Sequence, residues 1–79
     1  MDRTKTFETV KKYILNQLPV DSARVTEDAR LVEDLGADSA NLMMLVMDLE
    51  DAFGMTVDDD VIGDIRTVGD IVNAVLKKG

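Results

Sequence analysis

The stretch LGADSANLMML, residues 35–45, places a serine hydroxyl directly after an acidic residue and before a methionine-rich run. A serine nucleophile of the hydrolase type needs a general base, and the usual base, histidine, does not occur in this chain. The stretch also lacks the second glycine of a nucleophile elbow. Ser39 is therefore not predicted to be a self-activated nucleophile. Taken alone, Asp38 and Ser39 are typical of a helix N-cap.

A triplet of aspartates at 58–60 is the second feature that suggests chemistry, because calcium prefers carboxylate ligands. Counting from Asp58 as position one of a calcium-binding loop puts Ile62 at position five and Gly69 at position twelve, where oxygen-bearing side chains are required. The template fails, and only loose binding of divalent cations remains open. Cysteine and histidine are absent, which excludes disulfides and the usual zinc sites. We predict no catalytic residue and no dedicated metal site.

The acidic charge of the chain is concentrated in its middle. Residues 1–25 hold five basic and three acidic side chains, residues 26–65 hold one basic and twelve acidic ones, and residues 66–79 hold three basic and one acidic. Such a middle segment repels nucleic acid and anionic lipid, so a basic protein surface is the predicted partner. The alternative is that the acidic residues only keep a small protein soluble.

The length and hydropathy of the chain predict a single soluble domain over residues 1–79. A chain of 79 residues is near the lower limit for one hydrophobic core and has no room for a second. The N-terminal stretch MDRTKTFETV contains no apolar signal core, and no uninterrupted apolar run is long enough to span a membrane. We expect a cytoplasmic location without membrane insertion.

The apolar period is helical along the chain. The first predicted helix ends at Pro19, and its apolar stripe, with spacings of three and four residues, consists of Phe7, Val10, Ile14 and Leu18. The connection over residues 19–38 is long for a loop, and its apolar residues favour an ordered path. Thr26 is predicted to cap a short turn there. The side chains predicted to fold back onto the core are Leu31, Val32 and Leu35.

The second predicted helix runs from Ser39 to Phe53 and is closed by Gly54 at the C′ position. At about 100° per residue, its core face comprises Leu42, Val46, Leu49 and Phe53, with Leu45 and Ala52 beside them. The opposite face carries Met44 and Asp51, with Met47 and Asp48 next to them and Met43 and Glu50 at the margin. Met44 is thus predicted to be an exposed apolar residue on an acidic face.

The segment VDDDVIGDI, residues 57–65, predicts one or two helical turns that end near Ile65. A last helix is predicted to begin after Thr67, a favourable N-cap, with Asp70 placed for a weak capping box. Its buried face is expected to comprise Val68, Ile71, Val72 and Val75. The predicted fold class is all-α: a small four-helix bundle of three longer helices and one short helix, with a long first loop.

One family has these motifs in this order. The stretch LVEDLGADS, the helix LVMDLEDAFGM, the acidic short segment and IRTVGDIVNAV together resemble the acyl carrier proteins of fatty acid and polyketide synthesis, over residues 7–76. The resemblance implies that Ser39 receives 4′-phosphopantetheine from coenzyme A as a phosphodiester, with a phosphopantetheinyl transferase supplying the base and magnesium. It also implies that Asp38 caps the helix and helps to present Ser39, and that the arm supplies the thiol for acyl thioesters.

The resemblance further implies a carrier, not an enzyme, which delivers acyl intermediates between acyl-transferring, chain-elongating or ligase enzymes that present basic docking patches. The residues expected to meet these partners are Asp38, Met43, Met44, Met47, Asp48, Glu50 and Asp51. An acyl chain is expected to lie between the second helix and the short third segment, lined by Leu42, Leu49, Ile62 and Ile65, although any one of them, taken alone, is more typical of ordinary core. We expect a monomer.

The sequence departs from the family pattern at four positions. The leucine, the acidic residue, the glutamate and the proline that are usual in the family are replaced by Ala40, Asn41, Met44 and Asp58. Two of these changes remove negative charge where partners dock, which indicates a specialised member. Two alternatives stay open: a carrier of aminoacyl or peptidyl groups that shares the fold and Ser39, and an unmodified helical interaction module in which Asp38 and Ser39 only cap a helix.

Overall fold

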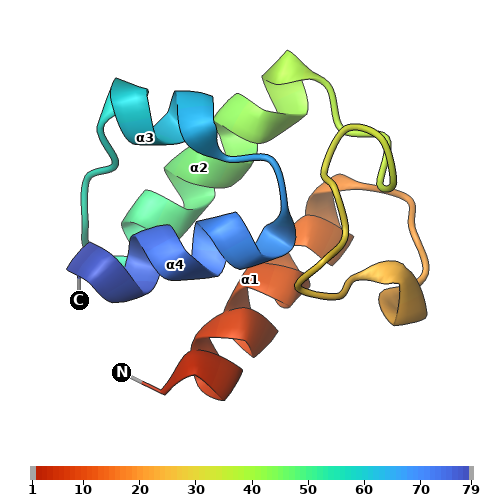
Figure 1. Ribbon diagram of the computed structural model, residues 1–79, viewed down its shortest axis with the longest axis horizontal. Helices are drawn as coiled ribbons and strands as arrows, with labels where there is room; N and C mark the ends of the chain where they lie inside the picture. Colours follow the sequence, from red (N-terminus) through yellow and green to blue (C-terminus); the bar gives the residue numbers. More distant parts are fainter. Residues whose placement is uncertain (1, 79) are drawn as a thin grey trace.

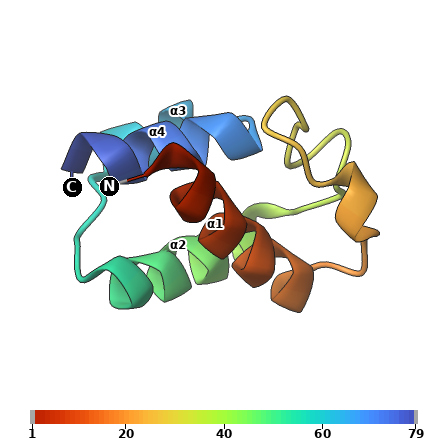
Figure 2. The same ribbon diagram turned by 90° about the horizontal axis from the view of Figure 1, so that it is seen from below.

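The computed structural model describes residues 2–78, and over that range it consists of four α-helices and one 3₁₀ turn (Figure 1). The helices are α1 (Arg3–Gln17), α2 (Ser39–Phe53), α3 (Asp59–Asp64) and α4 (Val68–Lys78), and the 3₁₀ turn is η1 (Ser22–Arg24). α1 packs against both α2 and α4, which lie on opposite sides of it when the molecule is seen from below (Figure 2). The predicted all-α four-helix bundle is confirmed, whereas η1 was not predicted.

α1 follows the predicted pattern closely. The carboxylate of Asp2 accepts the backbone N–H of Thr4 at 2.9 Å and so caps the first turn. The helix ends before Pro19, whose ring and missing N–H prevent its continuation. Val10 and Ile14 are fully buried, while Phe7 is half-buried.

The hydrophobic core draws side chains from α1, α2, α4 and the long connection. Its buried members are Val10, Ile14, Leu18, Val25, Ala29, Leu31, Leu35, Ala37, Leu45, Leu49, Val68, Ile71 and Val72. The face predicted for α4 is buried throughout, including Val75. On α2 the prediction that Ala52 borders the core is wrong: Ala52 is exposed, whereas Phe53 beside it is half-buried against the core, so the packed face at the last turn is narrower than predicted.

The long connection over residues 19–38 is held against the start of α4 by backbone hydrogen bonds. The N–H of Leu31 donates to the carbonyl of Arg66 at 2.9 Å, and the N–H of Val68 donates to the carbonyl of Ala29 at 3.0 Å. These two bonds form an isolated antiparallel bridge between loop and helix start. The loop is thus ordered by the last helix, although many residues separate the two in the chain.

The apolar residues of this connection do not all point inward. Leu31 and Leu35 are buried as predicted, but Val32 is 53% exposed, and its predicted burial is wrong. The turn over residues 31–35 explains the difference. The N–H of Leu35 donates to the carbonyl of Arg30 at 3.1 Å, so Leu31 and Leu35 share one side of the turn and Val32 faces away from it. The turn predicted at Thr26 is present, closed by its carbonyl, which accepts from Ala29 N–H at 3.1 Å.

α3 and the start of α4 agree with the predicted pattern. α3 ends at Asp64, one residue before the predicted end, and none of its side chains is buried. The capping box of α4 is complete, because the Asp70 carboxylate accepts the Thr67 N–H at 3.1 Å and the Thr67 hydroxyl oxygen accepts the Asp70 N–H at 3.1 Å. α4 is therefore fixed at its start, whereas α3 is attached only by half-buried side chains.

Candidate functional site

Ser39 is the first residue of α2, and its side chain is exposed at the tip where the loop enters the helix (Figure 1). The cap is made by its neighbour: the Asp38 carboxylate accepts the N–H of Asn41 at 2.8 Å. The Asn41 side-chain oxygen accepts the N–H of Asp38 in return, at 3.2 Å, which completes a capping box. The Ser39 hydroxyl is therefore not used to start the helix and is left available for chemistry.

The backbone before Ser39 makes a sharp turn with a fixed geometry. Gly36 has a φ of 75°, in the left-handed region that glycine adopts without strain. Its N–H donates to the carbonyl of Val32 at 3.1 Å, and the N–H of Ala37 donates to the carbonyl of Leu31 at 2.9 Å. Because Ala37 is also buried, the chain enters α2 from a fixed position and Ser39 is presented on a rigid support.

The chain contains a second Asp-Ser pair, Asp21 and Ser22, which gives an internal comparison. Ser22 is exposed like Ser39 and also begins a helical element. That element, η1, is a three-residue turn, and the Asp21 side chain makes no capping bond to it. The two pairs thus differ in the cap and in the length of the helix that follows, although their dipeptides are identical.

The N-terminus of α2 suits a phosphodiester on Ser39. The first-turn N–H groups of a helix have no partners within the helix, and together with the helix dipole they favour a nearby anion. α2 has 15 residues, so its dipole is well developed, and the exposed hydroxyl leaves room for a covalent substituent. The residues present therefore fit a phosphate-linked arm.

The predicted docking carboxylates have different environments. Asp48 is half-buried and its carboxylate accepts the Gln17 side-chain N–H at 3.1 Å, while the Glu50 carboxylate accepts the backbone N–H of Val57 at 2.7 Å. Asp48 therefore helps to join α2 to α1, and Glu50 holds the loop that leads to α3. Asp51 is exposed. The local pattern contained no signal for the internal bonds of Asp48 and Glu50, because their partners lie in other elements.

Three methionines are exposed on α2, as their helical positions predict. Met43, Met44 and Met47 have exposed fractions of 53%, 55% and 60%. Met43 and Met47 follow Ser39 at spacings of four residues, so these three side chains follow one side of the helix. A flexible apolar strip of this kind is typical of a contact surface.

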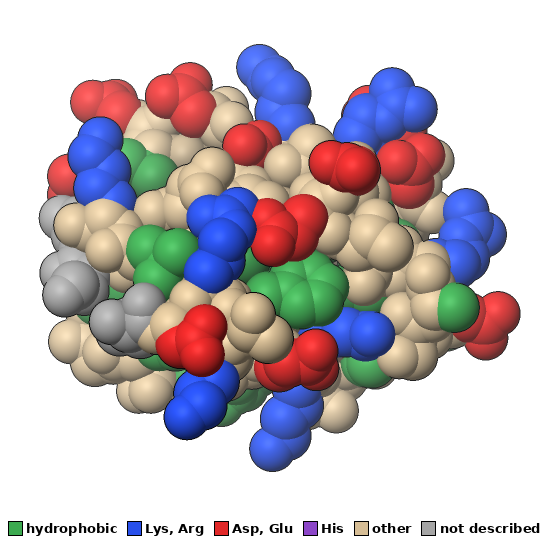
Figure 3. All heavy atoms as spheres, turned by 60° about the horizontal axis from the view of Figure 1, so that its bottom comes forward, with side chains coloured by type: hydrophobic (Ala, Val, Ile, Leu, Met, Phe, Trp, Pro, Cys, Tyr) green, Lys and Arg blue, Asp and Glu red, His purple; other side chains and the backbone are tan. Residues whose placement is uncertain are grey.

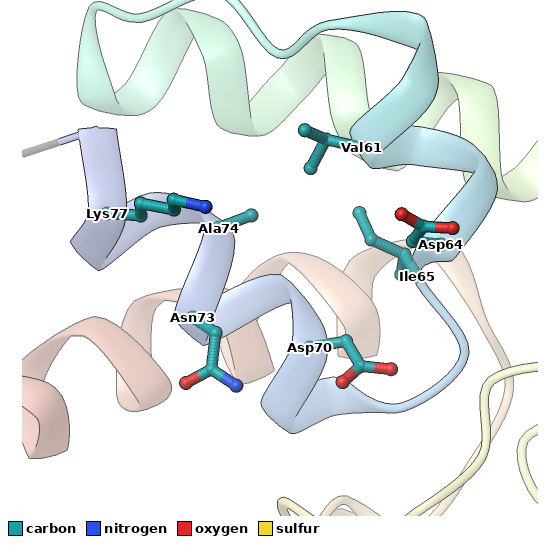
Figure 4. A pocket seen from close by; sticks show the side chains of 7 residues that line it. All are labelled: Val61, Asp64, Ile65, Asp70, Asn73, Ala74 and Lys77. Atoms are coloured by element: carbon teal, nitrogen blue, oxygen red, sulfur yellow. The ribbon is translucent and has the colours of Figure 1, made fainter.

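A pocket of about 230 Å³ lies between α3 and α4 (Figure 4). Its residues are Val61, Asp64, Ile65, Asp70, Asn73, Ala74 and Lys77. Of the four residues predicted to line an acyl pocket, Ile65 contributes to this one. Leu49 belongs to the core, and Leu42 and Ile62 are half-buried.

The carboxylates with shifted pKa values accept hydrogen bonds that hold the fold together. A side-chain hydrogen bond from Arg3 lowers the pKa of Glu27, and backbone N–H bonds from Arg30 and Arg66 lower the pKa of Asp34 and Asp70 respectively. Lysines and arginines are interspersed with carboxylates on the face where α1 lies in front (Figure 3). Along the sequence, the excess acidic charge lies in residues 26–65.

Within residues 2–78, no cluster of three or more acidic side chains is arranged to hold a metal ion. No helix in the same range is both long and apolar enough to cross a membrane.

Comparison with known proteins identifies the class. A family model described as "Phosphopantetheine attachment site" matches residues 8–75. An acyl carrier protein of Thermotoga maritima is 51% identical over 76 residues, which cover 96% of this chain and 94% of the relative. The solved acyl carrier protein of Enterococcus faecalis superposes with a TM-score of 0.84 at 33% identity and covers all of both chains. A Mycobacterium tuberculosis structure gives a TM-score of 0.85 at 33% identity, over 91% of this chain and 96% of that one.

The helical bundle and the family match define a phosphopantetheine-bearing carrier domain. With the Thermotoga relative, they show that the chain belongs to the acyl carrier protein family. Members of this family are carriers and not enzymes, their covalent cofactor is 4′-phosphopantetheine, and the arm supplies the thiol that bears the acyl group. They work with a phosphopantetheinyl transferase and with biosynthetic enzymes, typically those of fatty acid synthesis. The alternative of an unmodified interaction module is therefore rejected.

Proposed function

We propose that the 4′-phosphopantetheine arm of this carrier is attached to Ser39. The observation that carries the proposal is the division of roles at the start of α2, where Asp38 and Asn41 cap the helix and leave the Ser39 hydroxyl exposed. The Asp38 cap also fixes the position of the backbone at Ser39. The transferase then has to supply the base, which agrees with the absence of histidine.

The test is modification of the purified apo-protein with coenzyme A and a phosphopantetheinyl transferase, followed by intact mass measurement. Ser39→Ala should prevent addition of the arm, and Ser22→Ala should leave it unchanged. Because Asp38 remains as the cap, Ser39→Ala should keep the melting temperature close to that of the parent. An arm on the Ser39→Ala variant, or loss of the arm in the Ser22→Ala variant, would overturn the assignment.

We further propose that α2 is the docking surface for the partner enzymes, through Asp38, Met43, Met44, Met47, Asp48, Glu50 and Asp51. The exposure of the methionines and of Asp51 supports this proposal. Asp48 and Glu50 already accept internal hydrogen bonds, so they contribute charge more than new directed bonds. Contact energy from this surface then comes mainly from the methionines, because burying an apolar side chain contributes more than an exposed ion pair.

The acyl chain is proposed to enter beside α3, among Leu42, Leu49, Ile62 and Ile65. Support comes from α3 itself, which buries none of its side chains and is therefore easily displaced from α2. A chain that reaches Leu49 would have to open the core, whereas Ile65 already borders the pocket next to α4. The single domain over residues 1–79, the monomeric state, the cytoplasmic location and a specialised pathway remain predictions.

A further inference from the structure

Val32 is an exposed apolar side chain on the loop that leads to the candidate attachment serine. It is 53% exposed, as much as the methionines of α2, although it lies on the loop and not on the helix. Its neighbours Leu31 and Leu35 are buried at 1% and 4% exposure. The loop therefore has its own apolar anchors and does not need Val32 for its packing.

The position of Val32 is fixed by hydrogen bonds around it. Its carbonyl accepts the N–H of Gly36 at 3.1 Å, and the Asp34 carboxylate accepts the backbone N–H of Arg30 at 2.9 Å. The guanidinium of Arg24 donates to the Asp34 carbonyl at 3.1 Å. The exposed valine is thus presented on a rigid turn, so a partner that contacts it loses little conformational entropy from the loop.

The same bonds limit how far Val32 can lie from Ser39. Gly36 is bonded to Val32, and the three residues from Gly36 to Ser39 reach at most about 11 Å. On the other side, Met43 lies four residues beyond Ser39, a rise of about 6 Å along the helix. Exposed apolar side chains therefore lie on both sides of Ser39 along the chain, one in the loop and one in the helix.

We propose that Val32 is a contact for the phosphopantetheinyl transferase, paired with Met43 across the attachment serine; this inference rests on Ser39 as the attachment site. The transferase must bring the pyrophosphate of coenzyme A to the Ser39 oxygen, so its surface has to cover the parts of the loop and of α2 that flank that atom. Enzymes that act later meet the thiol at the far end of the arm and can dock farther along α2. The loop contact therefore serves modification of the carrier and not delivery of the acyl group.

The test compares Val32→Thr, which keeps the shape but replaces one methyl group with a hydroxyl, with Val32→Ile, which keeps the apolar surface. In steady-state modification of the apo-forms by a purified transferase, the KM of Val32→Thr should be raised about 3- to 5-fold, with kcat little changed. The reason is that about half of the apolar surface that the valine side chain buries against the transferase is lost in the variant. Val32→Ile should remain within about 2-fold of the parent. Since the side chain is exposed, the melting temperatures of both variants should stay within about 4 °C of the parent.

A second measurement separates the transferase from later partners. Val32→Thr, driven to the holo-form with excess transferase and loaded with an acyl group, should deliver that group to an acyl-accepting enzyme at the parent's rate. Equal kcat/KM values for Val32→Thr and parent in the transferase assay would overturn the inference, and so would an equal loss in both assays, which would make Val32 a general docking contact. Failure of the parent to be modified at Ser39 would instead overturn the proposed function.

Discussion

Removal of the Asp38 carboxylate should destabilise the start of α2 by a measurable amount. In Asp38→Ala the N–H of Asn41 loses its acceptor at 2.8 Å, and the reciprocal bond at 3.2 Å loses the geometry that supports it. Loss of an N-cap typically costs about 1 kcal/mol, within a range of about 0.5 to 2. For a domain of this size, about 1 kcal/mol corresponds to a decrease in melting temperature of about 4 to 8 °C.

Two further variants separate the cap from the charge. Asp38→Asn keeps a side-chain oxygen that can accept the Asn41 N–H, so it should lose no more than about 0.5 kcal/mol of stability while it removes one negative charge. Asn41→Ala removes the reciprocal half of the box and should cost about 0.5 to 1 kcal/mol. Because the two side chains form one unit, the effect of the double variant Asp38→Ala/Asn41→Ala should be less than the sum of the single effects.

The assay is thermal unfolding of the apo-forms followed by far-ultraviolet circular dichroism, in one buffer and at one salt concentration. The expected order of melting temperatures is parent, Asp38→Asn, Asn41→Ala, Asp38→Ala. An Asp38→Ala variant that melts with the parent would show that the capping box does not hold α2. A fully additive double variant would refute the reciprocal arrangement of the two side chains.

Three other outcomes can be measured with simple variants or buffers. Gly69→Ala should lower the melting temperature, because its Cβ would lie 3.0 Å from the Glu27 carbonyl oxygen; an unchanged value would contradict this. Below about pH 4.5 the melting temperature should fall as the pH is lowered. The pKa values of Glu27, Asp34 and Asp70 are lowered in the folded state, so their carboxylates stabilise the fold above the ordinary pKa values, and this stabilisation is lost when they are protonated. A melting temperature that rises as the pH is lowered to 3 would contradict this expectation. Met44→Glu should weaken binding to a dedicated partner enzyme by about 1.5 to 3 kcal/mol and leave modification at Ser39 nearly unchanged. Equal affinities of the variant and the parent would show that Met44 does not contribute to partner binding.

The elements that could be predicted from the sequence are those with local start and stop signals. α2 begins and ends at the predicted residues, because Asp38 and Asn41 encode its cap and Gly54 adopts the left-handed conformation at its end, with a φ of 62°. α4 is similar, since Thr67 and Asp70 lie within one turn. The exposure of Met44 also follows from helical geometry alone, once the core face is known.

Features that depend on contacts between elements could not be predicted in this way. The outward orientation of Val32 depends on the turn over residues 31–35 and on the burial of its neighbours. Asp48 bonds a residue 31 positions away, and Glu50 bonds the loop after its own helix. Ala52 is exposed although Phe53, the next residue, packs against the core. Apolar periodicity shows which residues share a face, but not how wide the covered part of that face is.

The attachment of the arm to Ser39 is tested most directly by tandem mass spectrometry of the carrier purified from its native host. The peptide that contains Ser39 should carry the mass of 4′-phosphopantetheine, with or without an acyl group, and fragmentation should place that mass on the serine. The peptide that contains Ser22 should be unmodified. An arm located on Ser22 or on a threonine, or a native protein without any arm, would contradict the account.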